Sequence, residues 1–359
     1  MIDDMFEIPP FSLDRAAKAA LLTEELAALT RHHFENCREY ANMLRARGFD
    51  PYAPLSHYAD LPFLPVRLFK DLSLKSAGDG EIFKTMTSSG TTGQAVSRIF
   101  LDRETASLQQ RVLVKIMADF IGAKRLPMII IDCPSVVNDR AMFSARGAGI
   151  LGFSMFGSDR IYALGDDMRL NAAGLADFLE KHGGGPMLLF GFTFMVWQHF
   201  YSELRKAPGK FDLSNGVLVH GGGWKKLASQ SVSPDEFKRR LRGACGLKSI
   251  HDYYGMVEQT GSIYVECERG HLHASIFSDA ITRRALDLSP CGVGEPGIIE
   301  VVSALPRSYP GHALLTEDEG VILGEDGCPC GRLGKYFKVL GRLKNAELRG
   351  CSDTYAAGF

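Results

Sequence analysis

The chain has 359 residues, of which 45% are hydrophobic and 23% charged, close to the values of an average globular protein. This composition excludes a wholly disordered chain, a collagen-like repeat and a coiled coil. With 41 Lys and Arg against 42 Asp and Glu, the formal net charge is −1, so there is no basic excess to hold a nucleic acid or an anionic membrane. The longest nearly uncharged apolar stretch, Pro186–Trp197, is 12 residues long, too short to cross a bilayer, so we expect no membrane span.

The amino terminus, MIDDMFEIPP, is acidic and lacks the basic and apolar regions of a signal peptide, which predicts a cytoplasmic protein. The chain contains eight cysteines. In a cytosolic chain of this length, they favour reduced thiols, a metal site or a reactive nucleophile over a disulfide framework.

Hydrophobic periodicity predicts a helical segment over Leu13–Arg47 that ends at Gly48, and a proline-rich extended connector follows it. Beyond the connector, short apolar runs alternate with helical windows. The predicted strands are Ile82–Thr87, Ser97–Leu101, Met128–Asp132, Met187–Phe190, Val217–His220 and Ile298–Ser303. The predicted helices are Arg103–Phe120, Met168–His182, Phe192–Lys206 and Pro234–Arg242.

Apolar runs flanked by helices predict an α/β fold, because strands covered by helices on both faces are apolar throughout. After about Gly294, short strands and turns predict a small β-rich subdomain. We place a helical lead-in and connector at 1–66, as part of the main domain, the rest of that domain at 67–340 and a short tail at 341–359.

A run of hydroxyl-bearing residues and glycines lies between two predicted strands: Thr87, Ser88, Ser89, Gly90, Thr91, Thr92 and Gly93. The glycines permit tight turns, and five hydroxyls with free backbone N–H groups can face an anion, so we interpret the run as a phosphate cradle. It is not the G-x-x-x-x-G-K-[ST] loop, because the lysine is absent and no helix follows directly. A surface turn rich in Ser, Thr and Gly is the alternative, which the complete string TSSGTTG disfavours.

At this string the sequence resembles the adenylate-forming superfamily, which includes acyl-CoA synthetases, peptide-synthetase adenylation domains and luciferases. Members of that superfamily bind ATP through a loop of this type and form an acyl-adenylate. The resemblance implies that 67–340 is an adenylate-forming (AMP-binding) domain and that the usual C-terminal domain is missing or reduced to a short tail.

Further motifs follow in the order and near the spacing of the superfamily, and the resemblance implies a role for each. Gly222 and Gly223 would form a wall of the adenine pocket, and Tyr254 and Gly255 would pack beside the adenine. Glu258 would bind Mg²⁺. Asp318 would bind the ribose, and Arg342 would contact the ribose–phosphate junction. A solvated turn for Asp318 and a surface ion pair for Arg342 are the alternatives.

Within the superfamily, a narrower resemblance is carried by SSGTTGQAVSRI, LLFGFTFMVW, HGGGWKK and CGRLGKYFKVLGRLKN. These strings resemble the LuxE family of acyl-protein synthetases, whose relatives include the phenylacetate–CoA ligases. The resemblance implies an enzyme that activates a fatty acid with ATP and Mg²⁺, moves the acyl group to its own cysteine and passes it to a partner reductase. Self-association into a homo-oligomer stays open.

Departures from the superfamily pattern concern positive charge at the phosphates. Gln94, Ala95 and Val96 follow the loop where the family has a lysine, and Val257 stands where the family has a threonine. The catalytic lysine of the usual C-terminal domain is also absent. We therefore expect the charge to come from Mg²⁺, from Arg342, from Lys225, Lys226 or Lys344, or from a partner.

Cys351 lies near the end of the chain, in Glu347-Leu-Arg-Gly-Cys351-Ser-Asp. A neighbouring Arg349 favours the reactive thiolate, and a thioester keeps an acyl group activated for transfer. LuxE-type proteins carry their acyl-accepting cysteine near the C-terminus, so the resemblance implies this role for Cys351. The alternative is a chance cysteine in a frayed tail.

Cys328-Pro-Cys330 predicts a pair of metal ligands, and the segment from Cys267 to His273 supplies partners for it. Three thiolates with either His271 or His273 would form a closed, tetrahedral, structural Zn²⁺ site. Some phenylacetate–CoA-ligase-like proteins carry a similar C-x-C-G-R with an upstream Cys and His. Reduced buried thiols beside a surface histidine pair are the alternative.

Three other functions remain open at this stage. The first is an acyl- or aryl-CoA ligase that releases a soluble thioester, the second is a non-catalytic subunit that binds an acyl group or a nucleotide, and the third is adenylation of an aryl or antibiotic precursor. The first and the third share a carboxylic acid and ATP as substrates.

Overall fold

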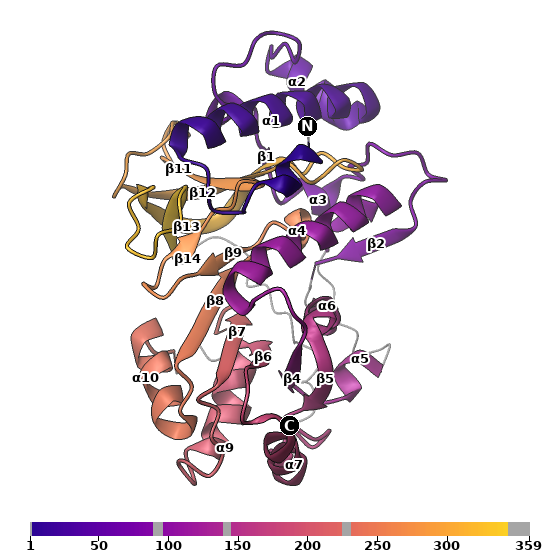
Figure 1. Cartoon of the computed structure of the whole chain (residues 1–359). Helices are drawn as coiled ribbons and strands as arrows, with labels where there is room; N and C mark the ends of the chain where they lie inside the picture. The colour runs from indigo at the N-terminus through magenta and orange to yellow at the C-terminus, as the bar shows by residue number, and fades with distance from the viewer. Residues whose placement is uncertain (1, 89–95, 139–144, 225–230, 344–359) are drawn as a thin grey trace. The chain divides into compact units, whose positions relative to one another are not determined.

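The computed structural model describes residues 2–88, 96–138, 145–224 and 231–343 (Figure 1). It divides into two compact units. Of the described residues, the first unit comprises 2–88, 96–120 and 255–343, and the second comprises 121–138, 145–224 and 231–254. Both units combine helices with strands, so the predicted α/β class is confirmed.

The α-helices are α1 (Arg15–Asn36), α2 (Arg38–Ala46), α3 (Leu68–Asp71), α4 (Arg103–Ile121), α5 (Ser135–Asn138), α6 (Ala145–Phe153), α7 (Ala172–His182), α8 (Thr193–Met195), α9 (Ser202–Leu204) and α10 (Pro234–Cys245). Short 3₁₀ turns are η1 (Asp4–Glu7), η2 (Tyr58–Asp60), η3 (Ser154–Phe156) and η6 (Val257–Gln259), and η4 (Val196–Tyr201) is a π-helix.

The strands are β1 (Leu64–Pro65), β2 (Lys84–Thr87), β3 (Arg98–Leu101), β4 (Leu126–Ile131), β5 (Gly157–Tyr162), β6 (Met187–Phe192), β7 (Gly216–Gly221), β8 (Ser249–Tyr254), β9 (Tyr264–Glu266), β10 (Leu272–His273), β11 (Ser278–Arg283), β12 (Pro296–Ser303), β13 (Ala313–Glu325) and β14 (Lys335–Arg342).

The first unit is built on a largely antiparallel sheet with the strand order β11-β12-β13-β14-β10-β9, and β1 pairs with β13 in parallel. Helix α1 lies along this sheet (Figure 1) and buries Leu22, Leu26 and Leu29. The buried Lys18 of α1 donates a hydrogen bond from Nζ to the carbonyl of Ala274. Strands β2 and β3 form a separate hairpin in the same unit.

The second unit contains a parallel sheet with the order β8-β7-β6-β4-β5. Every residue of β6 is buried, as are Met128–Ile131 of β4. This burial explains why both strands are apolar on both faces. In sheets of this kind, ligands bind beyond the carboxyl ends of the strands, so the residues that follow β6, β7 and β8 are candidates for a site.

Capping residues set several helix ends. The side chain of Asp14 accepts a hydrogen bond from the Ala17 N–H at the start of α1, and that of Ser233 accepts one from Glu236 at the start of α10. Helix α10 ends at Cys245, and the capping residue Gly246 has a φ of +79°, which only glycine readily adopts.

Four predicted elements are wrong in detail. The helical segment Leu13–Arg47 is two helices that meet at the extended residue Cys37. The helix predicted from Met168 begins at Ala172, because Met168 has a φ of +61° and Asn171 supplies the cap. The helix predicted over Phe192–Lys206 begins at Thr193, since Phe192 still belongs to β6, and its middle is the π-helix η4. After Gly294 the strands are long rather than short: β13 has 13 residues and β14 has 8.

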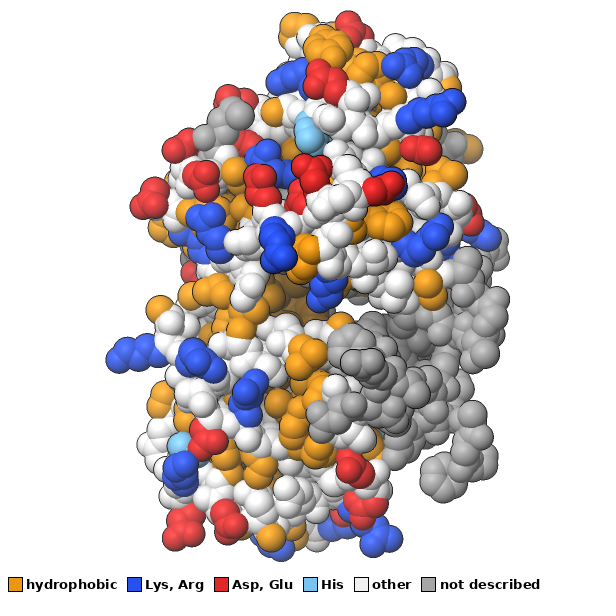
Figure 2. Space-filling view, turned by 90° about the vertical axis from the view of Figure 1, so that its right-hand side faces the viewer, with side chains coloured by type: hydrophobic (Ala, Val, Ile, Leu, Met, Phe, Trp, Pro, Cys, Tyr) orange, Lys and Arg blue, Asp and Glu red, His pale blue; other side chains and the backbone are white. Residues whose placement is uncertain are grey.

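The surface of the described residues is mixed in charge. On the face that Figure 2 presents, Lys and Arg side chains are interspersed with Asp and Glu side chains. Within the ranges that the structure describes, no helix has both the length and the apolar character needed to cross a membrane.

Candidate functional site

The predicted phosphate loop is only partly within the described residues. Thr87 ends β2, and Ser88 extends the hairpin beyond it, because its N–H donates to the Ser97 carbonyl over 3.1 Å and its Oγ accepts from the Ser97 N–H over 2.9 Å. The two strands predicted to flank the loop are present as β2 and β3, and the structure shows in addition that they pair in one antiparallel hairpin. The remaining loop residues, Ser89–Gly93, lie outside the described residues, as does Cys351.

In the second unit, the chain turns at the end of β7 through glycines. A Cβ on Gly221 would lie 2.5 Å from the Tyr253 ring, and one on Gly222, whose φ is +76°, would lie 3.1 Å from the Phe192 ring. Among the residues that the structure describes, no heavy atom lies within 4 Å of the position of a Cβ on Gly223. The turn therefore needs glycine for packing and for backbone conformation, and it leaves open space beside Gly223.

A polar cluster that the sequence did not predict lies at the carboxyl ends of β6, β7 and β8. His220 Nδ1 lies 3.0 Å from Thr193 Oγ1 and 3.6 Å from Asp252 Oδ1, and the Thr193 hydroxyl lies 3.2 Å from the Gly221 carbonyl. Burial lowers the pKa of His220 to about 3, with smaller contributions from Lys238 and His251, so the imidazole is neutral at physiological pH. The positions of these residues at the ends of parallel strands are the signal that would have found them.

Tyr254 is half-buried at the end of β8, and its neighbour Tyr253 belongs to an aromatic group. The Phe153 ring stacks on Phe190 with centroids 4.1 Å apart, and Tyr253 lies 5.4 Å from Phe153. Phe153, Phe190 and Tyr253 thus form an aromatic cluster on the second unit's sheet.

In the first unit, Glu258 lies on the single turn η6 and is 1% exposed. The hydroxyl of Tyr309 donates to the backbone carbonyl of Glu258 over 2.9 Å. The side-chain amide of the next residue, Gln259, donates to the carbonyls of Gly311 and Val301 over 2.8 and 3.1 Å. The turn is thus held on both sides by buried polar contacts.

The structure brings Asp318 and Arg342 directly together, because they are register partners on β13 and β14. Arg342 Nε lies 3.5 Å from Asp318 Oδ1, and Arg342 Nη2 lies 3.0 Å from Glu317 Oε2. Thr316 supports this part of β13, since its Oγ1 accepts a hydrogen bond from the Asp318 N–H over 3.1 Å. The arrangement places carboxylates and a guanidinium side by side in an ion pair, which is also the alternative weighed for Arg342, so the ligand-binding roles of Asp318 and Arg342 stay predictions.

The four predicted metal ligands also come together in the first unit. Cys267, His273, Cys328 and Cys330 each offer a ligand atom, and these atoms all lie within 4.8 Å of one another. The Cys267 and Cys328 sulfurs are 3.9 Å apart, and Cys330 Sγ is 3.3 Å from His273 Nε2. A tetrahedral Zn²⁺ with bonds of about 2.3 Å to sulfur and about 2.1 Å to nitrogen needs separations of about 3.8 Å between two sulfurs and about 3.6 Å between sulfur and nitrogen. The two pairs above lie within about 0.3 Å of these values, so the donor types and these distances fit that ion.

The surroundings of this Cys₃His cluster agree with a structural role. The Arg269 N–H donates to Cys267 Sγ over 3.4 Å, which orients that sulfur. Burial, followed by the charge of Arg332, lowers the pKa of His273 to about 4, so its imidazole is neutral and able to ligate. His271 lies at the edge, with Nδ1 3.4 Å from Cys328 Sγ, and stacks on Tyr336. Four protein donors leave no position for a water, which excludes a catalytic site of the usual open kind.

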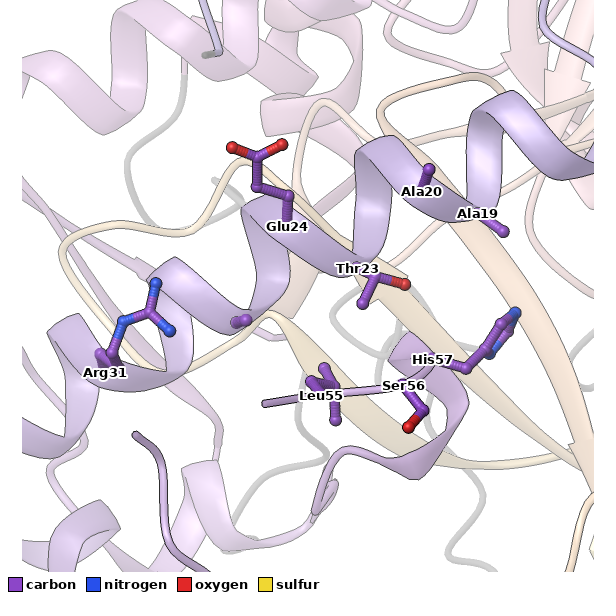
Figure 3. Close-up of a pocket in the computed structure, with 9 residues that line it drawn as sticks. Ala19, Ala20, Thr23, Glu24, Arg31, Leu55, Ser56 and His57 are labelled. Carbon is purple, nitrogen blue, oxygen red and sulfur yellow. The ribbon is translucent and has the colours of Figure 1, made fainter. Parts of the chain in front are cut away.

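A cavity of about 530 Å³ lies along α1 in the first unit (Figure 3). It is lined by Ala19, Ala20, Thr23, Glu24, Ala27, Arg31, Leu55, Ser56 and His57. None of the predicted site residues lines it, so this groove gives no support to the predicted chemistry.

Comparison with known proteins gives a consistent result. A family model described as "Acyl-protein synthetase, LuxE" matches residues 1–359. A long-chain-fatty-acid–luciferin-component ligase of Vibrio harveyi is 24% identical over 363 residues, which cover 92% of this chain and 85% of that protein.

Similar folds occur among solved structures. An open conformation of 2-hydroxyisobutyryl-CoA ligase in complex with 2-HIB-AMP and CoA has a TM-score of 0.68 and 16% identity, covering 93% of this chain and 71% of that one. The same ligase in its postadenylation state with 2-HIB-AMP has a TM-score of 0.67 and 16% identity, covering 92% of this chain and 69% of that one. At this identity the likeness establishes a shared fold, and it confirms the predicted adenylate-forming architecture.

Proposed function

Because the chain belongs to the LuxE family of acyl-protein synthetases, we propose that it activates a fatty acid with ATP and passes the acyl group to its own Cys351. Family membership makes it an AMP-forming acyl ligase. The fatty nature of the acid, the use of Cys351 and delivery to a partner reductase are the further content of the proposal. The observation that carries it is the match of the family model along the entire chain.

The reaction has two balanced steps. In the first, a carboxylate oxygen of the acid attacks the α-phosphorus of ATP, a mixed anhydride with AMP forms, and pyrophosphate leaves. In the second, the thiolate attacks the acyl carbonyl, a thioester forms, and AMP leaves. Because little covalent chemistry falls to the protein in the first step, its task is to position the reactants and to stabilise developing charge.

The residues proposed for that task differ in their chemistry. Bound Mg²⁺ would neutralise phosphate charge, and a buried carboxylate such as that of Glu258 suits a hard cation. Asp318 would accept hydrogen bonds from the ribose hydroxyls, and Arg342 beside it would donate to the ribose–phosphate junction. We assign the adenine to Gly222, Gly223 and Tyr254 and the phosphates to Ser88–Gly93.

The activation step is tested by ATP–pyrophosphate exchange with the purified chain, using saturated fatty acids of graded length and aryl acids. We expect exchange that depends on a fatty acid. Absence of exchange with every acid would contradict the proposal.

The transfer step is tested with a labelled fatty acid and ATP. A labelled protein band is expected in the wild type and absent in Cys351→Ser, whereas Cys291→Ser, which removes a half-buried thiol elsewhere, should keep the band. Exchange should persist in both variants, because the acceptor acts after adenylation. We propose that the reaction takes place in the cytoplasm and that an acyl-reductase is the partner that consumes the thioester.

Transfer to coenzyme A is the second candidate, because the fold is shared with 2-hydroxyisobutyryl-CoA ligase. The labelling experiment separates the two acceptors. A labelled product that forms only when CoA is added, and equally well in Cys351→Ser, would favour the ligase that releases a soluble thioester.

We also propose that Cys267, His273, Cys328 and Cys330 hold one structural Zn²⁺. The support is the closed Cys₃His donor set, whose ligand atoms all lie within 4.8 Å of one another. Bound metal would tie the β9–β10 hairpin to the turn between β13 and β14, since the four donors come from these two segments. Metal analysis of the purified chain should find one equivalent of zinc, and its absence from protein prepared with added zinc would contradict the assignment.

A further inference from the structure

The connection between β12 and β13, residues Ala304–His312, is buried although it has no regular secondary structure. We call it the 304–312 loop. Ala304, Leu305 and Tyr309 are each 0% exposed, and Ser308 is 1% exposed. Loops normally lie at the surface because their backbone polar groups need partners, so a buried loop of this kind needs a dense set of hydrogen bonds.

Those hydrogen bonds come from several elements of the first unit. His33 on α1 pairs through Nε2 with the Pro306 carbonyl over 3.0 Å, and His32 pairs with the Arg307 carbonyl over 2.9 Å. The Ser308 N–H donates to Thr105 Oγ1 over 3.1 Å. The 304–312 loop is therefore fixed from both α1 and α4.

The same loop holds the turn that carries Glu258. Its Tyr309 hydroxyl donates to the Glu258 carbonyl, and its Gly311 carbonyl accepts from the Gln259 amide. Gly311 lies so close that a Cβ there would be 2.9 Å from the Glu258 carbonyl oxygen. Loop and turn are thus packed with no room for a side chain between them.

The direction of the Tyr309 hydrogen bond is fixed by a third residue. Gln109 on α4 donates from Nε2 to the Tyr309 hydroxyl over 3.2 Å, so the single hydroxyl proton of Tyr309 goes to Glu258. Burial raises the pKa of Tyr309, and the negative charge of Glu258 adds to the effect, so the phenol keeps its proton. Gly261, with a φ of +90°, lets α4 approach this region, because a Cβ there would lie 2.5 Å from the Gln109 carbonyl.

We infer that Tyr309 is a positioning residue for Glu258, and that its hydroxyl fixes the backbone from which the Glu258 carboxylate reaches Mg²⁺. The inference rests on the proposed function, in which Glu258 holds the metal. A metal–oxygen bond of about 2.1 Å tolerates little displacement of the carboxylate. Loss of one hydrogen bond on the Glu258 carbonyl therefore weakens the hold on the metal without touching the acid or the nucleotide.

The test compares two substitutions that each remove one buried tyrosine hydroxyl from the first unit. Tyr309→Phe removes the bond to Glu258, and Tyr264→Phe removes a bond of the same 2.9 Å length to the Asp279 carbonyl. Tyr264 is 2% exposed, so the two changes are matched in burial and in the kind of bond lost. The measurement is the Mg²⁺ concentration that gives the half-maximal effect, determined both on ATP binding by equilibrium dialysis without acid and on ATP–pyrophosphate exchange.

For Tyr309→Phe we expect this concentration to rise about fivefold, the factor that corresponds to one ordinary hydrogen bond, with the KM for the acid unchanged. Excess Mg²⁺ should restore most of the rate. Tyr264→Phe should leave the Mg²⁺ dependence at the wild-type value. If Tyr309→Phe yields too little folded protein, Gln109→Met, which removes the donor to Tyr309, should shift the Mg²⁺ dependence in the same direction by a smaller factor.

Two negative results are distinguishable. If wild-type protein exchanges pyrophosphate and Glu258→Gln impairs it, but Tyr309→Phe and Gln109→Met match Tyr264→Phe, the positioning role is overturned and the proposed function stands. If wild-type protein shows no exchange with any acid, the proposed function and this inference fail together.

Discussion

Acidification from pH 7.5 to pH 5.5 should destabilise the first unit through His312. This side chain is 1% exposed and stacks on His33, with ring centroids 4.9 Å apart. Its Nε2 lies 3.0 Å from Thr30 Oγ1 and 3.3 Å from the Tyr40 hydroxyl. Among the residues that the structure describes, Nδ1 has no hydrogen-bond partner, so a second proton would be buried without an acceptor.

The magnitude follows from linkage between protonation and folding. Burial lowers the pKa of His312 to about 3, with a smaller contribution from His32, whereas an unfolded histidine titrates near a pKa of about 6.5. The stabilisation is therefore fully present above about pH 6.5 and is lost as the pH falls from there toward 3. At pH 5.5 the unfolded state binds the proton and the folded state does not, which lowers the free energy of unfolding by about 1.4 kcal/mol relative to pH 7.5.

The assay is urea unfolding followed by circular dichroism at both pH values. In His312→Gln the loss between the two pH values should be smaller than in the wild type by about 1.4 kcal/mol. Tyr40→Phe is the matched control, because it removes a hydrogen bond to the same imidazole but leaves the titrating group, so its pH-dependent loss should equal that of the wild type. If His312→Gln loses as much stability as the wild type, the imidazole is not held neutral by burial and the reasoning is refuted.

Three further outcomes are expected. Glu258→Gln should lower the rate of ATP–pyrophosphate exchange by about 100-fold at saturating substrate, since a carboxylate that binds Mg²⁺ acts on developing charge, and an unchanged rate would argue against the metal role. Cys328→Ser should reduce the zinc content measured by mass spectrometry and lower the melting temperature, whereas unchanged values in both would argue against the metal site. Gly222→Ala should lower the free energy of unfolding by about 1–3 kcal/mol, because its φ is +76° and a Cβ would press on Phe192. Gly223→Ala, whose Cβ would meet no atom within 4 Å among the described residues, should be near neutral.

The sequence predicts best where one physical cause dominates. Strands buried on both faces must be apolar throughout, and for that reason β4 and β6 were found within a few residues of their ends. The grouping of Cys267, Cys328 and Cys330 with a histidine was also predictable, since thiolates and imidazoles at short spacings have few other uses. Spacing left His271 and His273 as equal candidates, and the geometry groups His273 with the three cysteines.

Prediction failed where tertiary contacts override local preference. Strand β8 was missed because its sequence, SIHDYY, is largely polar, yet it pairs in parallel with β7. Strand β13 was expected to be short, because polar residues and glycines interrupt it. The structure accommodates them with register shifts near Gly320 and Gly324.

The break between α1 and α2 carries neither proline nor glycine as a signal. It occurs where Asn36 Nδ2 donates back to the His32 carbonyl, 2.8 Å away, and so competes with the helical ladder. The Tyr309–Glu258 contact could not be predicted either, because it joins residues 51 apart in the chain through a loop with no periodicity.

Strands β13 and β14 form a hairpin whose connecting segment contains Cys328 and Cys330. Side chains on a strand alternate between faces, so sliding one strand by a single residue would turn Arg342 away from Asp318. The middle of this segment packs against the β9–β10 hairpin, with Cys328 Sγ 3.9 Å from Cys267 Sγ and Cys330 Sγ 3.3 Å from His273 Nε2, so it has little slack to absorb an inserted or deleted residue. The connection between β13 and β14 should therefore tolerate few insertions or deletions, because a change in its length would shift Asp318 and Arg342 out of register.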